Sequence, residues 1–122
     1  MTPDPITIGS GTSVAVAYLM MRERGFRHLP VVDDGKLVGI LSVTDIGHAG
    51  AKVQSVREQP VSAIMTREPM TIRPDTAVEV AAATMASRKF NCLLVTEGDS
   101  LVGIVTTYDL LDALARRIRT EG

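Results

Sequence analysis

The side chains best suited to chemistry in this 122-residue chain are two hydroxyl–carboxylate pairs, Ser42 with Asp45 and Thr106 with Asp109. In each pair the hydroxyl precedes the carboxylate by three residues and follows an apolar run. Such groups can cap a helix by accepting hydrogen bonds from backbone N–H groups, or they can bind a polar ligand. No Ser/His/Asp or Cys/His set converges on one locus, and no glycine-rich phosphate loop carries a lysine. We therefore expect a binding protein with no catalytic residues rather than an enzyme.

The composition excludes several other classes of protein. The 13 basic and 14 acidic residues leave a net charge of −1, so nucleic acid is a poor partner. Cys92 is the single cysteine and His28 and His48 are the only histidines, so we expect no internal disulfide and no metal site. No apolar run approaches the roughly 18 residues that cross a membrane, and the first residues lack the features of a secretion signal. The sequence therefore predicts a soluble cytoplasmic protein that requires no cofactor.

An internal repeat organises the chain. A shift of 64 positions aligns residues 1–46 with residues 65–110 without a gap, and 19 of the 46 pairs are identical. The sequence Leu-Val-Gly-Ile, for example, occurs at residues 37–40 and again at residues 101–104. The protein is therefore a duplicated unit. We place the two copies at residues 1–58 and 59–122, because Gln59-Pro60 marks a break between them.

Each copy predicts the element order strand, helix, strand, strand, helix. The first helix is expected to be capped by Thr12 or Thr76, and the last helix to follow Asp45 or Asp109 at its cap position. Each copy has an apolar sheet face that is too small to close alone, and two copies are too few for an open solenoid. We therefore predict an α/β (α+β) fold in which two units related by a pseudo-twofold axis pack their sheets together.

The motifs around the hydroxyl–carboxylate pairs are distinctive. The first copy reads Gly-Phe-Arg-His-Leu-Pro-Val-Val-Asp at residues 25–33 and Leu-Val-Gly-Ile-Leu-Ser-Val-Thr-Asp at residues 37–45. The second reads Phe-Asn-Cys-Leu-Leu-Val at residues 90–95 and Leu-Val-Gly-Ile-Val-Thr-Thr-Tyr-Asp at residues 101–109, after Val-Ser-Ala-Ile-Met-Thr at residues 61–66. On these residues each copy resembles the cystathionine β-synthase (CBS) domain, and the tandem pair resembles a Bateman module. The resemblance covers nearly the whole chain.

The resemblance implies that the hydroxyl–carboxylate pairs bind nucleotides. The hydroxyl would meet phosphate, and the aspartate would accept hydrogen bonds from both ribose hydroxyls. The resemblance also implies two clefts shared between the copies, each with its adenine side from one copy and its ribose side from the other. The first site would contain Ile6, Phe26, Arg27, His28, Thr106, Tyr108 and Asp109. The second site would contain Met70, Phe90, Asn91, Cys92, Ser42, Thr44 and Asp45.

Simpler roles stay open for several of these residues. Asp45 and Asp109 could be helix caps only, although their retention in both copies favours ligand contact, and one oxygen could serve each role. Phe26 and Phe90 could equally be core residues. We favour a structural or wall position for His28 over a phosphate contact, because lone histidines usually satisfy local hydrogen bonds.

These observations predict a regulatory module that binds an adenosine-containing ligand, namely AMP, ADP, ATP or S-adenosylmethionine, and signals to an unknown regulated protein. The alternative is a non-binding structural or dimerisation module. Arg27 corresponds to Asn91 in the repeat, so we expect the site with Arg27 to prefer the more anionic ligands. The last helix carries an apolar stripe that predicts a homodimer, and its residues are Leu110, Leu111, Leu114 and Ile118.

Overall fold

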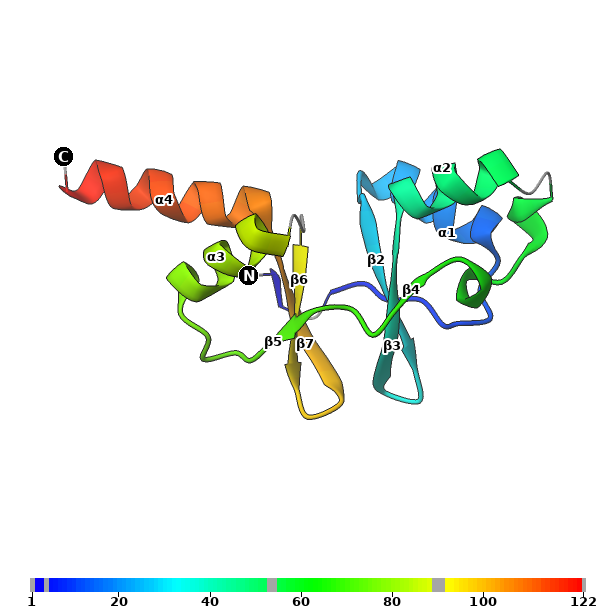
Figure 1. Cartoon of the computed structure of the whole chain (residues 1–122), viewed down its shortest axis with the longest axis horizontal. Helices are drawn as coiled ribbons and strands as arrows, with labels where there is room; N and C mark the ends of the chain where they lie inside the picture. The colour runs from blue at the N-terminus through cyan, green and yellow to red at the C-terminus, as the bar shows by residue number, and fades with distance from the viewer. Residues whose placement is uncertain (1, 4, 53–54, 89–91, 122) are drawn as a thin grey trace. The chain divides into compact units, whose positions relative to one another are not determined.

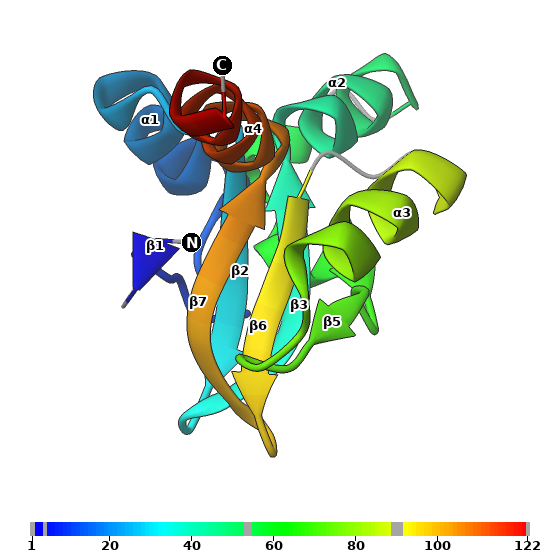
Figure 2. The same cartoon turned by 90° about the vertical axis from the view of Figure 1, so that its left-hand side faces the viewer.

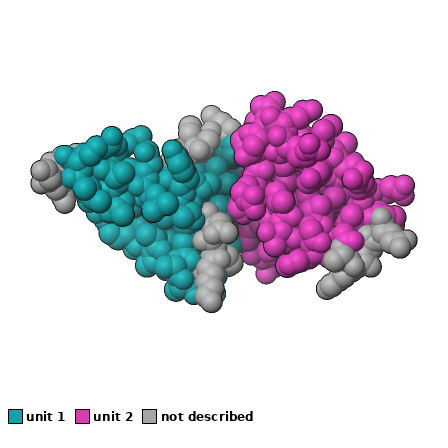
Figure 3. All heavy atoms as spheres, turned by 90° about the horizontal axis from the view of Figure 1, so that it is seen from above, with its two compact units in different colours: residues 1–5, 70–122 teal, residues 6–69 magenta. Residues whose placement is uncertain are grey.

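The chain folds into two compact units. The computed structural model describes residues 2–3, 5–52, 55–88 and 92–121. Unit 1 contains Met1–Pro5 and Met70–Gly122, and unit 2 contains Ile6–Pro69 (Figure 3). Each unit has a small β-sheet and two α-helices (Figure 1), so the predicted α+β class is confirmed. None of the helices in the described part of the chain is long and apolar enough to span a bilayer.

Unit 2 contains a three-stranded antiparallel sheet. Its elements are α1 (Val14–Arg24), β2 (His28–Asp33), β3 (Lys36–Ser42), α2 (Val43–Lys52), the short 3-10 helices η1 (Val56–Glu58) and η2 (Val61–Ala63), and β4 (Thr66–Arg67). The strand order is β2-β3-β4. The β2–β3 turn passes through Asp34 and Gly35, which have φ angles of 50° and 78°. The strand expected before the first helix of this copy is reduced in unit 2 to one bridge, between Ile8 and Val31.

Unit 1 repeats this arrangement with one more strand. Its elements are β1 (Thr2–Pro3), β5 (Thr71–Ile72), α3 (Val78–Arg88), β6 (Cys92–Glu97), β7 (Ser100–Thr106) and α4 (Thr107–Glu121). The strand order is β1-β7-β6-β5 (Figure 2), and β5 runs parallel to β6 while the other pairs are antiparallel. The repeated order of helix, hairpin and helix is as predicted. The packing of the two sheets against one another stays a prediction.

The two copies of the sequence repeat exchange their leading strands. β1 belongs to the first copy but pairs with β7 of the second, and β4 belongs to the second copy but pairs with β3 of the first. The repeat relates the two registers, since Thr2 lies opposite Ile104 and Thr66 lies opposite Ile40. The boundaries between the compact units therefore lie between residues 5 and 6 and between residues 69 and 70. The break between the copies that we placed from the sequence lies near Gln59.

Gly39 makes room for the exchanged strand β4. It lies opposite Arg67, and a Cβ atom built on it would be 2.7 Å from Sδ of Met65 and 2.8 Å from the carbonyl oxygen of Thr66. The backbone oxygen can move away only if the β3–β4 pairing is distorted, so the position needs glycine. Its repeat counterpart Gly103 lies opposite Pro3 of β1.

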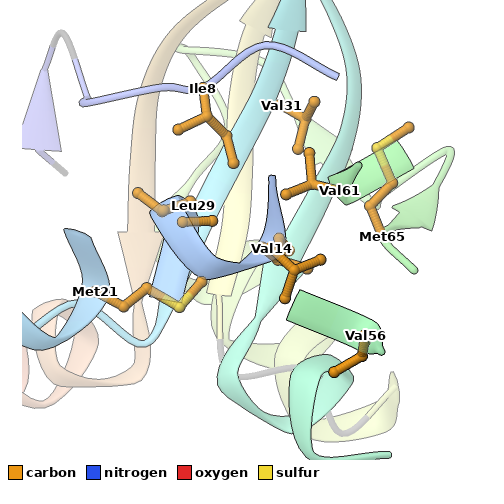
Figure 4. Packing of buried hydrophobic residues seen from close by; sticks show 10 residues of the cluster. Ile8, Val14, Met21, Leu29, Val31, Val56, Val61 and Met65 are labelled. Carbon is orange, nitrogen blue, oxygen red and sulfur yellow. The ribbon is translucent and has the colours of Figure 1, made fainter. Parts of the chain in front are cut away.

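The core of unit 2 is aliphatic. Val14, Ala17 and Met21 recur at helical spacing on α1, and all three are buried. Figure 4 shows Val14 and Met21 within the core. They share one cluster with the buried residues of the hairpin and of the segment after α2, which are Ile8, Leu29, Val31, Leu41, Val56, Val61 and Met65. The segment that follows α2 is therefore part of this core rather than a loose connection.

Among the described residues, the core cluster of unit 1 has fewer buried members than that of unit 2. Ala81 and Met85 of α3 pack with Leu93 of β6, and all three are buried. The partly buried residues around them are Met70, Ile72, Val105 and Leu110. Both helices of this unit thus contact the same sheet face, because Leu93 and Val105 are paired across β6 and β7.

The N-cap of α1 lies one residue later than predicted. Ser13 is the cap, and its Oγ accepts a hydrogen bond from the N–H of Val16 at 3.2 Å. Thr12 lies in the turn before the helix, as does Thr76, whose Oγ1 accepts from the N–H of Arg73 at 3.1 Å. The prediction that these threonines cap the helices was wrong, because threonine also stabilises turns through its local backbone hydrogen bonds.

Candidate functional site

The two hydroxyl–carboxylate pairs have the same geometry in both units. The N–H of Ser42 donates to Oδ2 of Asp45 at 2.9 Å, and the N–H of Asp45 donates to Oγ of Ser42 at 3.0 Å. The corresponding distances are 2.9 Å and 3.2 Å for Thr106 and Asp109. These reciprocal bonds form a capping box at the start of α2 and of α4. Ser42 and Thr106 directly precede the helices, and the aspartates lie in the first turn rather than at the predicted cap position.

Each capping box engages only one oxygen of its aspartate. Within the described part of the chain, no hydrogen bond is donated to Oδ1 of Asp45 or of Asp109. Both residues are partly exposed. Each carboxylate also lies in the first turn of its helix, at the positive end of the helix dipole. Each unit therefore presents a fixed carboxylate oxygen that can accept hydrogen bonds from a ligand.

In unit 2 the start of β2 lies beside the Ser42–Asp45 pair. His28, the first residue of β2, is paired with Ser42, the last residue of β3. The carbonyl oxygen of Arg27 accepts a hydrogen bond from the N–H of Val43 at 3.1 Å. Burial and the neighbouring Arg27 charge lower the pKa of His28, and the Asp45 carboxylate opposes them. The unit 2 half-site, as we call it, therefore comprises Arg27, His28, Ser42, Thr44 and Asp45.

The remaining predicted residues of unit 2 lie in different surroundings. Phe26 follows the end of α1, and the residue is 37% exposed, so it does not fill the core of this unit. Thr44 is exposed on the first turn of α2. Ile6 is partly buried and packs against the core cluster of the unit. The structure thus supports surface positions for Phe26 and Thr44 and a core contact for Ile6.

Unit 1 has a matching half-site that comprises Cys92, Thr106, Tyr108 and Asp109. Cys92 is paired with Thr106 across β6 and β7, just as His28 is paired with Ser42. Burial raises the pKa of Cys92 to about 11, which favours the unreactive thiol. Tyr108 is 76% exposed on the first turn of α4, whereas Met70 packs against the core of the unit. Phe90 and Asn91, also predicted here, lie outside the described residues.

Neither half-site has the composition of a metal centre. Among the described residues, no group of three His, Cys, Asp or Glu side chains could hold a metal ion. The two half-sites share a capped carboxylate, and among their described residues the permanent cation is Arg27 of the unit 2 half-site. The arrangement can therefore bind a polar ligand in each unit and can attract an anion at one of them.

Comparison with known proteins decides the family. The model of the CBS domain matches residues 1–51 and 61–116, one match for each copy of the repeat. The chain belongs to the CBS domain family. Both hydroxyl–carboxylate pairs lie within the matched residues, at the end of the second hairpin strand of each CBS motif.

CBS-domain proteins of similar size and fold have been characterised structurally. CBSX2, solved in complex with AMP, superposes with a TM-score of 0.87 at 31% identity, covering 98% of this chain and 94% of that protein. The CBS domain pair of protein MJ0100, solved with 5′-methylthioadenosine and S-adenosyl-L-methionine, gives a TM-score of 0.83 at 32% identity, covering 93% and 90%. The CBS domain-containing protein YhcV of Bacillus subtilis is 29% identical over 90% of this chain and 79% of its own length.

Longer enzymes also carry a related segment. Homoserine O-acetyltransferase of Methanohalobium evestigatum is 36% identical over 90% of this chain, and inosine-5′-monophosphate dehydrogenase of Korarchaeum cryptofilum is 36% identical over 88%. In both cases the aligned segment is 22% of the enzyme's length. The CBS motifs of this chain thus correspond to about a fifth of these enzymes.

Sequence reasoning did not foresee one neighbourhood within unit 2. It placed Arg27 and His28 with Asp109, whereas within unit 2 they lie beside Asp45. The β2–β3 turn was the signal that could have revealed this, because a hairpin closed by Asp34 and Gly35 brings residue 28 opposite residue 42. The predicted combination of half-sites from different repeats stays a prediction.

Proposed function

We propose that this CBS pair is a regulatory module that binds an adenosine-containing ligand: AMP, ADP, ATP or S-adenosylmethionine. One observation carries the proposal: in both repeats an aspartate oxygen is fixed by a capping box while the other carboxylate oxygen accepts no hydrogen bond from the described chain. The two hydroxyls of a ribose are donors, and an ionised carboxylate is an acceptor only. The ligands in the CBSX2 and MJ0100 structures all contain adenosine, which supports this ligand class.

The chemistry assigns a role to each group of the half-sites. Oδ1 of Asp45 and of Asp109 would accept from ribose hydroxyls, while the hydroxyl hydrogens of Ser42 and Thr106 are available as donors to phosphate. Arg27 adds a charge-assisted hydrogen bond to a phosphate at one site. Following the resemblance, each ligand would use the adenine side of one repeat and the ribose side of the other.

The test is calorimetric titration of the chain with AMP, ADP, ATP and S-adenosylmethionine, with thermal unfolding as a second readout. A ligand that binds only the folded state raises the unfolding temperature. The double variant Asp45→Ala/Asp109→Ala is the control that should not bind. If no adenosine compound binds the wild-type chain, the chain is a non-binding structural or dimerisation module instead.

The same module is proposed to form a homodimer through α4. Four large hydrophobic residues of this helix are more than half exposed, namely Tyr108, Leu111, Leu114 and Ile118, while Leu110 packs against the core of unit 1. An apolar stripe of this kind on a helix is typical of a protein interface. The regulated protein, the cytoplasmic location and the absence of catalysis stay predictions that accompany this proposal.

A further inference from the structure

The repeat relates His28 of unit 2 to Cys92 of unit 1. Each residue begins the first strand of its hairpin, where it lies opposite Ser42 or Thr106. An imidazole changes its charge in mild acid, whereas burial raises the pKa of Cys92 to about 11 and keeps that thiol neutral. The unit 2 half-site therefore has a group that can gain a charge where the unit 1 half-site has a neutral one.

The pleat of the unit 2 sheet places His28 and Ser42 on the same face. The next pair along the hairpin is Leu29 with Leu41, and both of these residues are buried in the core of the unit. Because successive side chains of a strand point to opposite faces, His28 and Ser42 point away from that core. Directly opposed residues have Cβ atoms about 4.5–5.5 Å apart. The imidazole therefore neighbours the Ser42 hydroxyl, which we propose as a donor to phosphate.

The imidazole of His28 is accessible to a ligand. Within the described residues, no hydrogen bond involves its ring nitrogens. No buried side-chain nitrogen in the described chain lacks a hydrogen-bond partner, so neither ring nitrogen is enclosed. His28 is therefore half-buried, but it is not held by a local hydrogen bond, and its nitrogens can bind a group that comes from solvent.

The charges that act on His28 have opposite signs. Burial and the exposed Arg27 lower its pKa, whereas the Asp45 carboxylate in the first turn of α2 opposes them. The other elements packed against β2 are β3 and α1, whose charged residues are exposed, namely Lys36, Arg22, Glu23 and Arg24. His28 is consequently neutral at pH 7 and becomes a second cation beside Arg27 in mild acid.

We propose that protonation of His28 strengthens the binding of phosphate-bearing adenosine ligands at the unit 2 half-site, so that this site responds to mild acid. The inference rests on the proposed function, because it needs a phosphate near Ser42. An imidazolium there adds a charge-assisted hydrogen bond to the phosphate, and the bound phosphate in turn favours uptake of a proton by His28. The neighbourhood within unit 2 carries this inference, whichever repeat supplies the ribose side.

The test is calorimetric titration of the full chain with ATP at about pH 7.5 and about pH 5.5, for the wild type and for His28→Asn. The terminal phosphate of ATP also titrates in this range, but it does so with both proteins, so the effect of His28 is the difference between them. On acidification the affinity of the wild type should rise about tenfold relative to that of His28→Asn. Adenosine, which has no phosphate, should show no such gain.

Two controls separate this effect from a loss of structure. His48→Asn changes an exposed histidine of α2 outside the half-site and should keep the pH dependence of the wild type, and circular dichroism would verify the fold of both variants. A second measurement needs no variant: imidazole chemical shifts of the labelled wild type near pH 6.5. Addition of ATP should move His28 toward the imidazolium form and leave His48 unchanged, and adenosine should move neither.

The possible outcomes distinguish this inference from the proposed function. If ATP binds with the same pH dependence to the wild type and to His28→Asn, and the imidazole shifts of His28 do not change, the ligand proposal stands and this inference is wrong. A wild type that binds ATP more weakly in acid than His28→Asn does would show that the imidazolium pairs with Asp45 instead of phosphate, which also overturns it. No binding of any adenosine compound would overturn both proposals.

Discussion

Ser42 and Asp45 hold each other in place, because each backbone N–H donates to the side-chain oxygen of the other, at 2.9 Å and 3.0 Å. The carboxylate is thereby fixed before any ligand arrives. A ligand that binds this carboxylate therefore loses no binding free energy to ordering the aspartate side chain. The same relationship between Thr106 and Asp109 makes the two repeats equivalent at this point, so differences between their sites must come from the neighbouring residues.

Removal of either aspartate should affect one ligand site and spare the other. Asp109→Ala should abolish binding at the site predicted to include Ile6, Arg27 and His28, and Asp45→Ala should abolish binding at the other site. Loss of a hydrogen bond to a charged group costs about 1.5–3 kcal/mol, or roughly 10- to 150-fold in affinity. Titration calorimetry with AMP on each variant measures this.

Ser13→Ala is the matched control for the aspartate variants. It removes a helix cap that lies outside the half-sites, where Oγ accepts from the N–H of Val16. Like the aspartate variants, it should cost about 1 kcal/mol of unfolding free energy. It should leave AMP binding unchanged. If both aspartate variants bind AMP as the wild type does, Asp45 and Asp109 are helix-capping residues only.

The repeat and the element order could be predicted from the sequence, since they depend on local patterns, whereas the site residues stay a prediction. Apolar runs separated by a turn specify each hairpin, and in unit 2 the turn at Asp34–Gly35 sets the register that places His28 opposite Ser42. The strand exchange could not be predicted, because β1 and β4 are only two residues long. Such short strands leave no periodic signal, and their pairing depends on distant residues such as Gly39.

The two ligand sites should differ in charge preference. Arg27 should strengthen binding of ATP relative to adenosine at its own site, and this preference should weaken as salt is raised, because the charge is exposed and screened. Calorimetric titrations of both compounds at low and high salt measure the effect. Arg27→Gln should remove the salt dependence, and Arg57→Gln, a change of an exposed arginine outside the half-sites, should not.

A double-mutant cycle would identify the aspartate that acts with Arg27. If the site is shared between the repeats as predicted, Arg27→Gln and Asp109→Ala should be non-additive in ATP affinity, while Arg27→Gln and Asp45→Ala should be additive. The reverse pattern would show that the neighbourhood seen within unit 2 is the functional site. Two equal sites without salt dependence would show that Arg27 has no role in ligand choice.

Gly39→Ala should destabilise the chain although it adds one methyl group. The new Cβ would lie 2.8 Å from the carbonyl oxygen of Thr66, so we expect a loss of about 1–3 kcal/mol of unfolding free energy. Gly47→Ala in α2 is the control and should raise the unfolding free energy. Nothing lies within 4 Å of its Cβ position, and alanine is favoured over glycine within a helix by about 0.5–1 kcal/mol. Urea unfolding of both variants measures the changes; an unaffected Gly39→Ala variant would show that β3–β4 pairing tolerates a side chain.

The α4 stripe should hold a homodimer together. Leu111 and Leu114 are both more than half exposed, and Leu111→Glu or Leu114→Glu would place a charge in the proposed interface. We expect the wild type to have a dimeric mass by light scattering at tens of micromolar, and each variant to be monomeric. Ala113→Glu lies on the same helix outside the stripe and should stay dimeric. A monomeric wild type at these concentrations would contradict the prediction.

Stability should fall in mild acid because of His28. Burial and Arg27 lower its pKa below the 6.5 of an ordinary histidine, so the unfolded chain takes up a proton more readily than the folded chain. The contribution of neutral His28 is therefore present above pH 6.5 and is lost as the pH falls through the lowered pKa. Thermal unfolding from about pH 7.5 to about pH 5.5 should show a steeper loss for the wild type than for His28→Asn. His48→Asn changes an exposed histidine of α2 and should lose stability with falling pH as the wild type does. An equal pH dependence of stability in all three proteins would mean that His28 titrates alike in the folded and unfolded chain.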